Sequence, residues 1–223
     1  DGAGDLRRGI GRVIETFVLH GLRDGEVGDA RLHHGAAVGI VDLENTIRAL
    51  NGVQATPGRM ETFGGAEEPL AIVDYAHTPD ALRRVIAAAR EIATGRVICL
   101  FGAGGDRDRS KRADMGRAGA TAEMVVITSD NPRSEDPQSI IYEVLAGCVA
   151  QQVHVAPDRE AAIAWALRTA RAGDVLLIAG KGHEKVQIIG RQRIPFDDAA
   201  ICRKYLALRH SAPHFRIPER VTQ

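Results

Sequence analysis

The sequence predicts an α/β fold of the Rossmann-like, doubly wound type, with a mostly parallel sheet. From residue 69 onward, short apolar runs alternate with longer segments in which apolar residues recur at helical spacing. Hydrophobic residues make up 44% of the chain but aromatic residues only 4%, so the core must consist mainly of Val, Ile, Leu and Ala. That composition is typical of a parallel sheet that helices cover. Polar motifs follow four of the strands, where ligands bind in this architecture.

The strands are predicted from continuous apolar runs that are bounded by turn signals. In chain order, the runs cover residues 70–74, 96–101, 124–128, 153–156 and 175–179. Two further short segments, 186–189 and 193–196, predict a closing hairpin.

The helices are predicted from apolar residues three or four positions apart and from start signals. In one of them the apolar positions are Leu82, Val85, Ile86 and Ala89, and in another Pro137 stands at an acceptable first-turn position. The predicted helices cover residues 79–92, 111–122, 137–149, 159–172 and 197–208.

The first part of the chain has a different character, because it shows no clear succession of strands. A helix is predicted over residues 41–50, with Asp42 as its N-cap. Pro57-Gly58 and the glycines that follow predict a loop through Gly65. At the other end, the residues from Ser211 onward are expected to fray. We therefore divide the chain into residues 1–65, 66–210 and 211–223.

Composition and charge exclude several classes of partner. Lys and Arg (29) balance Asp and Glu (29), which argues against a nucleic acid or an anionic membrane as partner. No apolar run approaches the roughly 20 residues that span a bilayer, and the polar first residues do not resemble a signal peptide. Three cysteines that lie far apart in sequence indicate a cytoplasmic protein without disulfides or a cysteine metal site.

The glycine-rich segment 102–109 (GAGGDRDR) lies between a predicted strand and a predicted helix. Its glycines allow a tight turn and close approach to a ligand, and the helix N-terminus behind them favours negative charge. Arg107 could bind a carboxylate or phosphate through two parallel hydrogen bonds. On the residues alone, a structural turn with a solvated charge run is an equal alternative. The spacing is not that of a dinucleotide fingerprint.

Two further motifs carry opposite charges on loops after strands. Asp130 and Arg133 suit a zwitterion, with Asp for an ammonium group and Arg for a carboxylate, although an ordinary Asx-type turn is favoured if the motif stands alone. Glu184 could bind a second ammonium group, and Gly180 could offer its carbonyl. Between them stands Lys181, but no phosphate loop of the Walker A type occurs in the chain.

The segment 74–77 (DYAH) suits a nucleotide. An aspartate after a strand suits ribose hydroxyls, and the rings of Tyr75 and His77 suit a purine face. Arg59, on a glycine-loosened turn, could meet phosphate, although a surface arginine is the simpler interpretation.

Taken together, the strings PGRME, VDYAHTPDAL, FGAGGDRDRSKR, TSDNPRSEDP and AGKGHE resemble the Mur ligase family, in which they occur in the same order. Within it they resemble the UDP-N-acetylmuramoyl-tripeptide synthetases, and the resemblance covers about residues 40–208. It implies that ATP phosphorylates the carboxylate of UDP-MurNAc-L-Ala-D-Glu, that an incoming amine attacks the acyl phosphate, and that phosphate leaves. The domain seen here would supply the amino-acid pocket and close over the nucleotide, which excludes water.

The resemblance also implies roles for individual residues. The DNPR string is the family's mark of meso-diaminopimelate, whose distal carboxylate Arg133 would bind. Lysine lacks that carboxylate and would leave a buried Arg133 unpaired. The implied amino-acid pocket consists of Arg107, Asp130, Asn131, Arg133, Gly180 and Glu184. The residues implied to meet ATP are Arg59, Asp74, Tyr75 and His77.

The sequence also departs from the family pattern. Family members are longer and carry a Walker-type loop, magnesium ligands and a carbamylated lysine in a central ATPase domain, none of which is found here. The interpretation is that residues 1–65 are the end of that central domain and a hinge, that Mg²⁺ is bound outside this chain, and that the chain is a monomer that is inactive alone. The match is loosest over residues 1–35.

Three alternatives stay open. The chain could be a non-catalytic module that binds an amino acid or a nucleotide, since the phosphate loop is missing. It could be a relative that adds lysine or glutamate, against which the DNPR, GKGHE and GGDRD strings weigh. It could also be an unrelated metabolic α/β domain, which would require five ordered motifs to coincide by chance.

Overall fold

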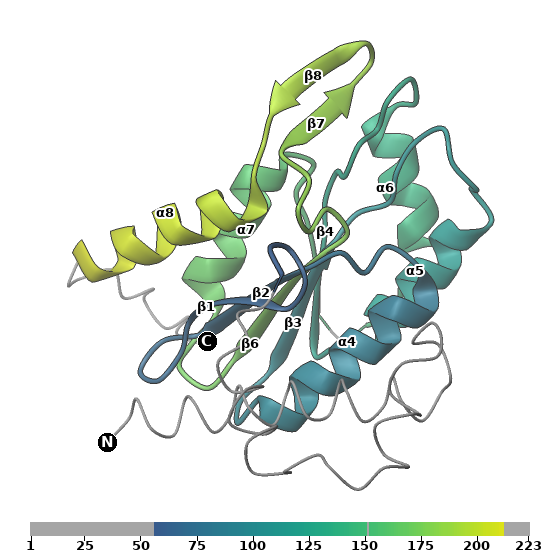
Figure 1. The fold of residues 1–223 in the computed structure, drawn as a ribbon. Helices are drawn as coiled ribbons and strands as arrows, with labels where there is room; N and C mark the ends of the chain where they lie inside the picture. Colours follow the sequence, from purple (N-terminus) through teal and green to yellow (C-terminus); the bar gives the residue numbers. More distant parts are fainter. Residues whose placement is uncertain (1–55, 151, 212–223) are drawn as a thin grey trace, which may run out of the picture.

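A six-stranded sheet forms the centre of the structure, and helices cover both of its faces (Figure 1). The computed structural model describes residues 56–150 and 152–211, so the helix predicted over residues 41–50 lies outside the described residues. The strand order is β1-β2-β6-β3-β4-β5; β1 runs antiparallel to β2, and the other neighbours are parallel. The strands are β1 (Glu61–Gly64), β2 (Leu70–Asp74), β3 (Val97–Phe101), β4 (Met124–Ile127), β5 (Gln152–Val155) and β6 (Val175–Ala179). The prediction of a mostly parallel α/β sheet is confirmed.

Three of the described helices begin directly after a residue whose side chain caps them. Thr78, Asp136 and Asp158 each accept a hydrogen bond from a backbone N–H in the first turn that follows them. The helices are α4 (Pro79–Ile92), α5 (Lys111–Gly119), α6 (Pro137–Leu145), α7 (Arg159–Thr169) and α8 (Asp198–Ser211).

The sheet separates two apolar clusters because successive side chains of a strand point to opposite faces. In β6, Val175, Leu177 and Ala179 pack with α4, α5 and α6, whereas Leu176 and Ile178 pack with α7 and α8. Both sets are fully or almost fully buried. The central strands therefore contain apolar residues on both faces, which explains the continuous runs in the sequence.

A separate two-stranded hairpin, β7 (Val186–Ile189) with β8 (Gln192–Pro195), follows β6 and precedes α8 in the chain. It projects away from the main sheet (Figure 1). It is attached to the loop after β4 through the backbone of Arg133. The Arg133 N–H donates to Ile188 O at 3.0 Å, and Gly190 N–H donates to Arg133 O at 2.7 Å.

Four local expectations were wrong. Residues 61–64 form strand β1 rather than a loop; this short, half-buried edge strand has no apolar run, and β2 supplies its pairing. The domain boundary that we expect after residue 65, one residue beyond the end of β1, stays a prediction. Three helices end early, α5 at Gly119, α6 at Leu145 and α7 at Thr169. Beyond α6, Gly147 lies so close to α5 that a Cβ atom there would be 1.8 Å from Ala113 O.

None of the helices in the described residues is long and apolar enough to cross a membrane. Cys99, Cys148 and Cys202 are free thiols, as expected; Cys99 and Cys202 are buried and Cys148 is partly buried.

Candidate functional site

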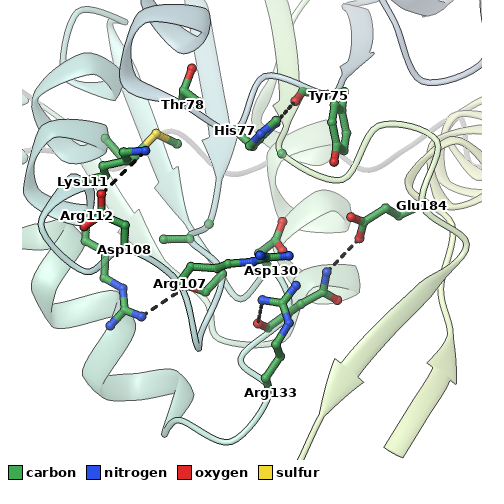
Figure 2. Close-up of a pocket in the computed structure, with 16 residues that line it drawn as sticks. Tyr75, His77, Thr78, Arg107, Asp108, Lys111, Arg112, Asp130, Arg133 and Glu184 are labelled. Carbon is green, nitrogen blue, oxygen red and sulfur yellow. Dashed lines mark hydrogen bonds and ion pairs between the residues drawn. The ribbon is translucent and has the colours of Figure 1, made fainter.

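A cavity of about 390 Å³ lies at the carboxyl ends of the parallel strands (Figure 2). All six residues of the predicted amino-acid pocket line it, although they come from three separate loops. Of the residues predicted to meet ATP, Tyr75 and His77 line the same cavity, whereas Arg59 and Asp74 do not. The structure therefore brings together eight of the ten predicted site residues around one space.

Two arginines provide positive charge in this cavity. A Cβ atom added to Gly104 would lie 3.0 Å from Arg133 Nη1 and 3.6 Å from Arg107 Cγ, so both side chains lie close to this glycine. Arg133 Nη1 donates to Gly105 O at 2.6 Å, which orients the guanidinium group. Arg107 is exposed and, among the described residues, makes no ion pair or hydrogen bond through its side chain, and it points into the cavity (Figure 2). One arginine is thus held in place, and the other is free to adjust to a ligand.

Two carboxylates provide negative charge. Burial raises the pKa of Asp130, although the nearby charges of Arg159 and Lys181 oppose this. Within the described residues no hydrogen bond reaches the Asp130 carboxylate, which is directed into the cavity (Figure 2). For Glu184, burial would raise the pKa, but hydrogen bonds from Asn131 and Lys181 lower it overall.

Asn131 and Glu184 are fixed by a buried lysine. Lys181 Nζ donates to Asn131 Oδ1 at 3.0 Å, to Glu184 Oε2 at 3.0 Å and to Val186 O at 2.8 Å. Asn131 also accepts from Ile188 N–H at 2.9 Å and donates through Nδ2 to Glu184 Oε2 at 2.8 Å. The loop after β6, the loop after β4 and strand β7 are therefore joined behind the cavity.

The loops after β3 and β4 fit against each other through glycines. A Cβ atom at Gly102 would lie 2.3 Å from Thr128 O, and one at Gly105 would lie 1.9 Å from Pro132 O. Only glycine permits this approach, so a larger residue at either position would force the two loops apart.

Charged residues complete the junction of these two loops. Asp106 accepts hydrogen bonds from the N–H and the hydroxyl of Ser134, and its own N–H donates to Glu135 at 2.6 Å. Arg112, which is buried, donates to both oxygens of Glu135, to Glu143 and to Gly104 O. The hydrogen bond from Arg112 is the main cause that lowers the pKa of Glu135 to about 2. The DRDRSKR and DNPRSEDP strings are thus two halves of one contact.

The residues predicted to meet ATP lie at the end of β2. The Asp74 carboxylate accepts from Met60 N–H at 3.0 Å and from Ala76 N–H at 2.8 Å, so it holds the turn that contains Arg59 against the strand. The Arg59 guanidinium lies 5.7 Å from the centre of the Tyr75 ring. The His77 ring lies 4.6 Å from the Tyr75 ring. Asp74 thus has a structural role, which the sequence did not predict.

A buried ion pair lies behind the site. Arg159 and Asp198 are both 0% exposed in their side chains and share two hydrogen bonds, of 2.9 and 2.8 Å. Arg159 also donates to Ala179 O at 3.0 Å, at the end of β6. It fixes the strand end from which Gly180 enters the cavity.

Sequence reasoning missed the supporting residues Lys181, Arg112 and Arg159. No sequence signal marks any of the three as buried, and only the tertiary structure shows that it is. Within residues 56–150 and 152–211, no group of three or more His, Cys, Asp or Glu side chains could hold a metal ion.

Comparison with known proteins gives consistent results. The sequence pattern of the family described as "Mur ligase, glutamate ligase domain" matches residues 58–182. The UDP-N-acetylmuramoyl-L-alanyl-D-glutamate–2,6-diaminopimelate ligase of Chromobacterium violaceum is 52% identical over 169 residues, which are 74% of this chain and 34% of that protein. The ligase of the same name from Gloeobacter violaceus is 49% identical over 211 residues, 93% of this chain and 43% of that protein.

A solved structure of a UDP-N-acetylmuramoyl-L-alanyl-D-glutamate–2,6-diaminopimelate ligase is also similar, with a TM-score of 0.67 and 38% sequence identity. The similarity covers 79% of this chain and 37% of that one. The chain therefore spans well under half the length of the relatives that it matches.

Proposed function

The chain belongs to the Mur ligase family, and we propose that it provides the amino-acid pocket and part of the ATP site for the ligation of meso-diaminopimelate to UDP-MurNAc-L-Ala-D-Glu. The names of the relatives from Chromobacterium violaceum and Gloeobacter violaceus are those of ligases with this specificity. Because the chain covers only part of their length, the complete reaction is proposed for the enzyme of which this fold forms one part, and no ligation is expected from this chain alone.

The observation that carries the proposal is the arrangement of charge in the cavity. Arg107 and Arg133 offer two guanidinium groups, and Asp130 and Glu184 offer two carboxylates. Diaminopimelate has a carboxylate and an amine at each end, so it can pair with all four groups. A partly buried charge costs free energy unless it is paired. Asp130, Arg133 and Glu184 are partly buried, so this cavity favours a ligand that carries charges of both signs.

The same arrangement distinguishes diaminopimelate from lysine. Lysine has a single carboxylate and would leave one guanidinium group without an anionic partner. Arg133 is the residue implied for the second carboxylate, and it is already oriented by Gly105 O. The loss of a charge-assisted, two-fold hydrogen bond in a partly buried site costs several kcal/mol, which corresponds to about 100-fold or more in affinity.

The residues would act mainly by binding and orienting the amino acid. Holding the ligand at both ends fixes the attacking amine, so that much of the entropy of the bimolecular step is lost on binding rather than during the reaction. ATP supplies the phosphoryl group that activates the acceptor carboxylate. Arg59, Asp74, Tyr75 and His77 would bind its phosphate, ribose and adenine, and Tyr75 and His77 line the same cavity as the amino-acid residues. The nucleotide and the incoming amine would therefore lie next to each other.

The proposal is tested by calorimetric titration of this chain with meso-diaminopimelate, with L-lysine as the competing ligand. We expect diaminopimelate to bind at least 100-fold more tightly than lysine. Arg133→Ala should lose about 100-fold in affinity for diaminopimelate, because the second carboxylate loses its partner. Arg193→Ala is the matched control: Arg193 is exposed on β8 and does not line the cavity, so its affinity should be unchanged.

Equal affinity for lysine and diaminopimelate would contradict the proposed specificity. Absence of binding by a chain whose circular dichroism shows an intact α/β fold would contradict an amino-acid pocket on this part of the enzyme.

A further inference from the structure

Lys181 occupies an unusual place for a lysine between two glycines at the end of a strand. Its side chain is 0% exposed, and it is among the largest fully buried side chains of the described residues. A lysine in a glycine-rich loop after a parallel strand is typical of a residue that binds phosphate. Here the ammonium group points into the protein.

All three N–H donors of Lys181 are used by the protein. They serve the Asn131 side chain, the Glu184 side chain and the carbonyl of Val186, each within 3.0 Å. The Phe196 ring lies 6.0 Å from the ammonium group on another side. Lys181 therefore has no donor left for a ligand and does not line the cavity.

The two side chains that Lys181 holds do line the cavity. Asn131 Oδ1 accepts from both Lys181 and Ile188 N–H, so its amide nitrogen must point to the side of Glu184. Glu184 Oε2 accepts from both Asn131 and Lys181, which leaves Oε1 for a ligand. One buried cation thus sets the orientation of an amide and of a carboxylate.

From this geometry, and resting on the proposed function, we infer that Lys181 is a positioning residue: it fixes Asn131 and Glu184 in the orientation that receives an ammonium group of the amino-acid substrate. It acts through Glu184 and Asn131 and does not touch the substrate. Residues that orient the groups in direct contact with a ligand change its affinity by factors comparable to those of single hydrogen bonds to charge.

Calorimetric titration of the chain with meso-diaminopimelate tests this inference in a double-mutant cycle. Lys181→Met keeps the length of the side chain but removes its charge and donors, and it should weaken binding about 10- to 100-fold. In a Glu184→Gln background the same substitution should weaken binding only about 3-fold, because the contact that matters most is already gone. Lys185→Met is the matched control: this lysine of the same loop has a 56% exposed side chain and should not affect binding.

The inference is overturned if Lys181→Met binds within 2-fold of the unaltered chain, or if it costs the same factor in both backgrounds, as a general loss of stability would. If Lys181→Met does not fold, Lys181→Arg serves instead. It keeps the charge, but its planar donors cannot reach all three acceptors, so affinity should still fall while the fold persists. Unchanged affinity in Lys181→Arg would overturn the inference.

A second measurement does not depend on binding and so separates this inference from the proposed function. Hydrogen exchange of the Asn131 side-chain amide, followed by NMR without any ligand, should be at least 10-fold faster in Lys181→Met. Failure of the unaltered chain to bind diaminopimelate would contradict the proposed function alone. Unchanged exchange would show that Lys181 does not fix Asn131.

Discussion

Replacing Asp198 by Asn removes the negative charge from the ion pair behind the site and leaves the Arg159 guanidinium buried. Both side chains are 0% exposed and are joined by two hydrogen bonds. Breaking a buried pair from one side costs about 3–5 kcal/mol. We expect a value near the lower limit, about 3 kcal/mol, because Arg159 keeps its bond to Ala179 O and asparagine retains one acceptor.

Equilibrium unfolding in urea, followed by circular dichroism, measures this loss. If the free energy of unfolding falls by about 2 kcal/mol per molar urea, the urea concentration at the midpoint of unfolding should fall by about 1.5 M. The double substitution Arg159→Met with Asp198→Leu removes both charges. Its free energy of unfolding should stay within about 1 kcal/mol of that of the unaltered chain.

An exposed pair between the same two helices provides the control for Asp198→Asn. Glu160 and Lys204 form an ion pair at 2.7 Å, with side chains 40% and 57% exposed. Lys204→Met should cost less than about 1 kcal/mol. The reasoning would be refuted if Asp198→Asn lost no more than this control, or if the double substitution were as unstable as the single one.

Three further predictions concern other parts of the structure. Gly105→Ala should lower the free energy of unfolding, measured in urea, by about 3 kcal/mol, because the new Cβ atom would lie 1.9 Å from Pro132 O. It should also weaken the binding of diaminopimelate. An unchanged midpoint of urea unfolding would contradict the tight fit of the loops after β3 and β4. The hydrogen bond from Arg112 lowers the pKa of Glu135 from 4.5 to about 2. The stability that this hydrogen bond provides is therefore complete above pH 4.5 and is lost as the pH falls from 4.5 to 2. In Glu135→Gln the free energy of unfolding should depend less steeply on pH between 4.5 and 2. An equally steep loss of stability in acid would refute this role of Glu135. Burial raises the pKa of the Cys99 thiol, so iodoacetamide at pH 8 should label it at least 100-fold more slowly in the folded chain than in urea, as mass spectrometry of peptides would show.

Much of the fold could be predicted because local and global signals agree in this sequence. The apolar run Val175–Ala179 is a central strand, as predicted, because helices cover both of its faces. Helix α4 begins and ends at the predicted residues, and its buried face contains the predicted apolar positions Leu82, Val85, Ile86 and Ala89. Strand β1 could not be predicted, since its half-buried residues have no apolar pattern and its pairing depends on β2.

The lining of the cavity was also predictable, because polar motifs at the ends of parallel strands must meet at one edge of the sheet. What supports that lining was not. Nothing in the sequence around Lys181 or Arg112 indicates burial, because their burial depends on partners that are distant in the chain, such as Asn131 and Glu135. The roles of the lining residues in binding stay predictions that the titrations test.

The attachment of Arg133 to the hairpin has a consequence for how this site can change over evolution. The N–H of Arg133 donates to Ile188 O in β7, and its carbonyl accepts from the N–H of Gly190, the residue directly after β7. An insertion or deletion of one residue in β7 would reverse the faces of the hairpin relative to this anchor, as any shift of one residue in a strand does. The number of residues between Glu184 and Gly190 is therefore expected to be inherited together with the side chains of the pocket, so that lineages with the same pocket conserve the length of β7.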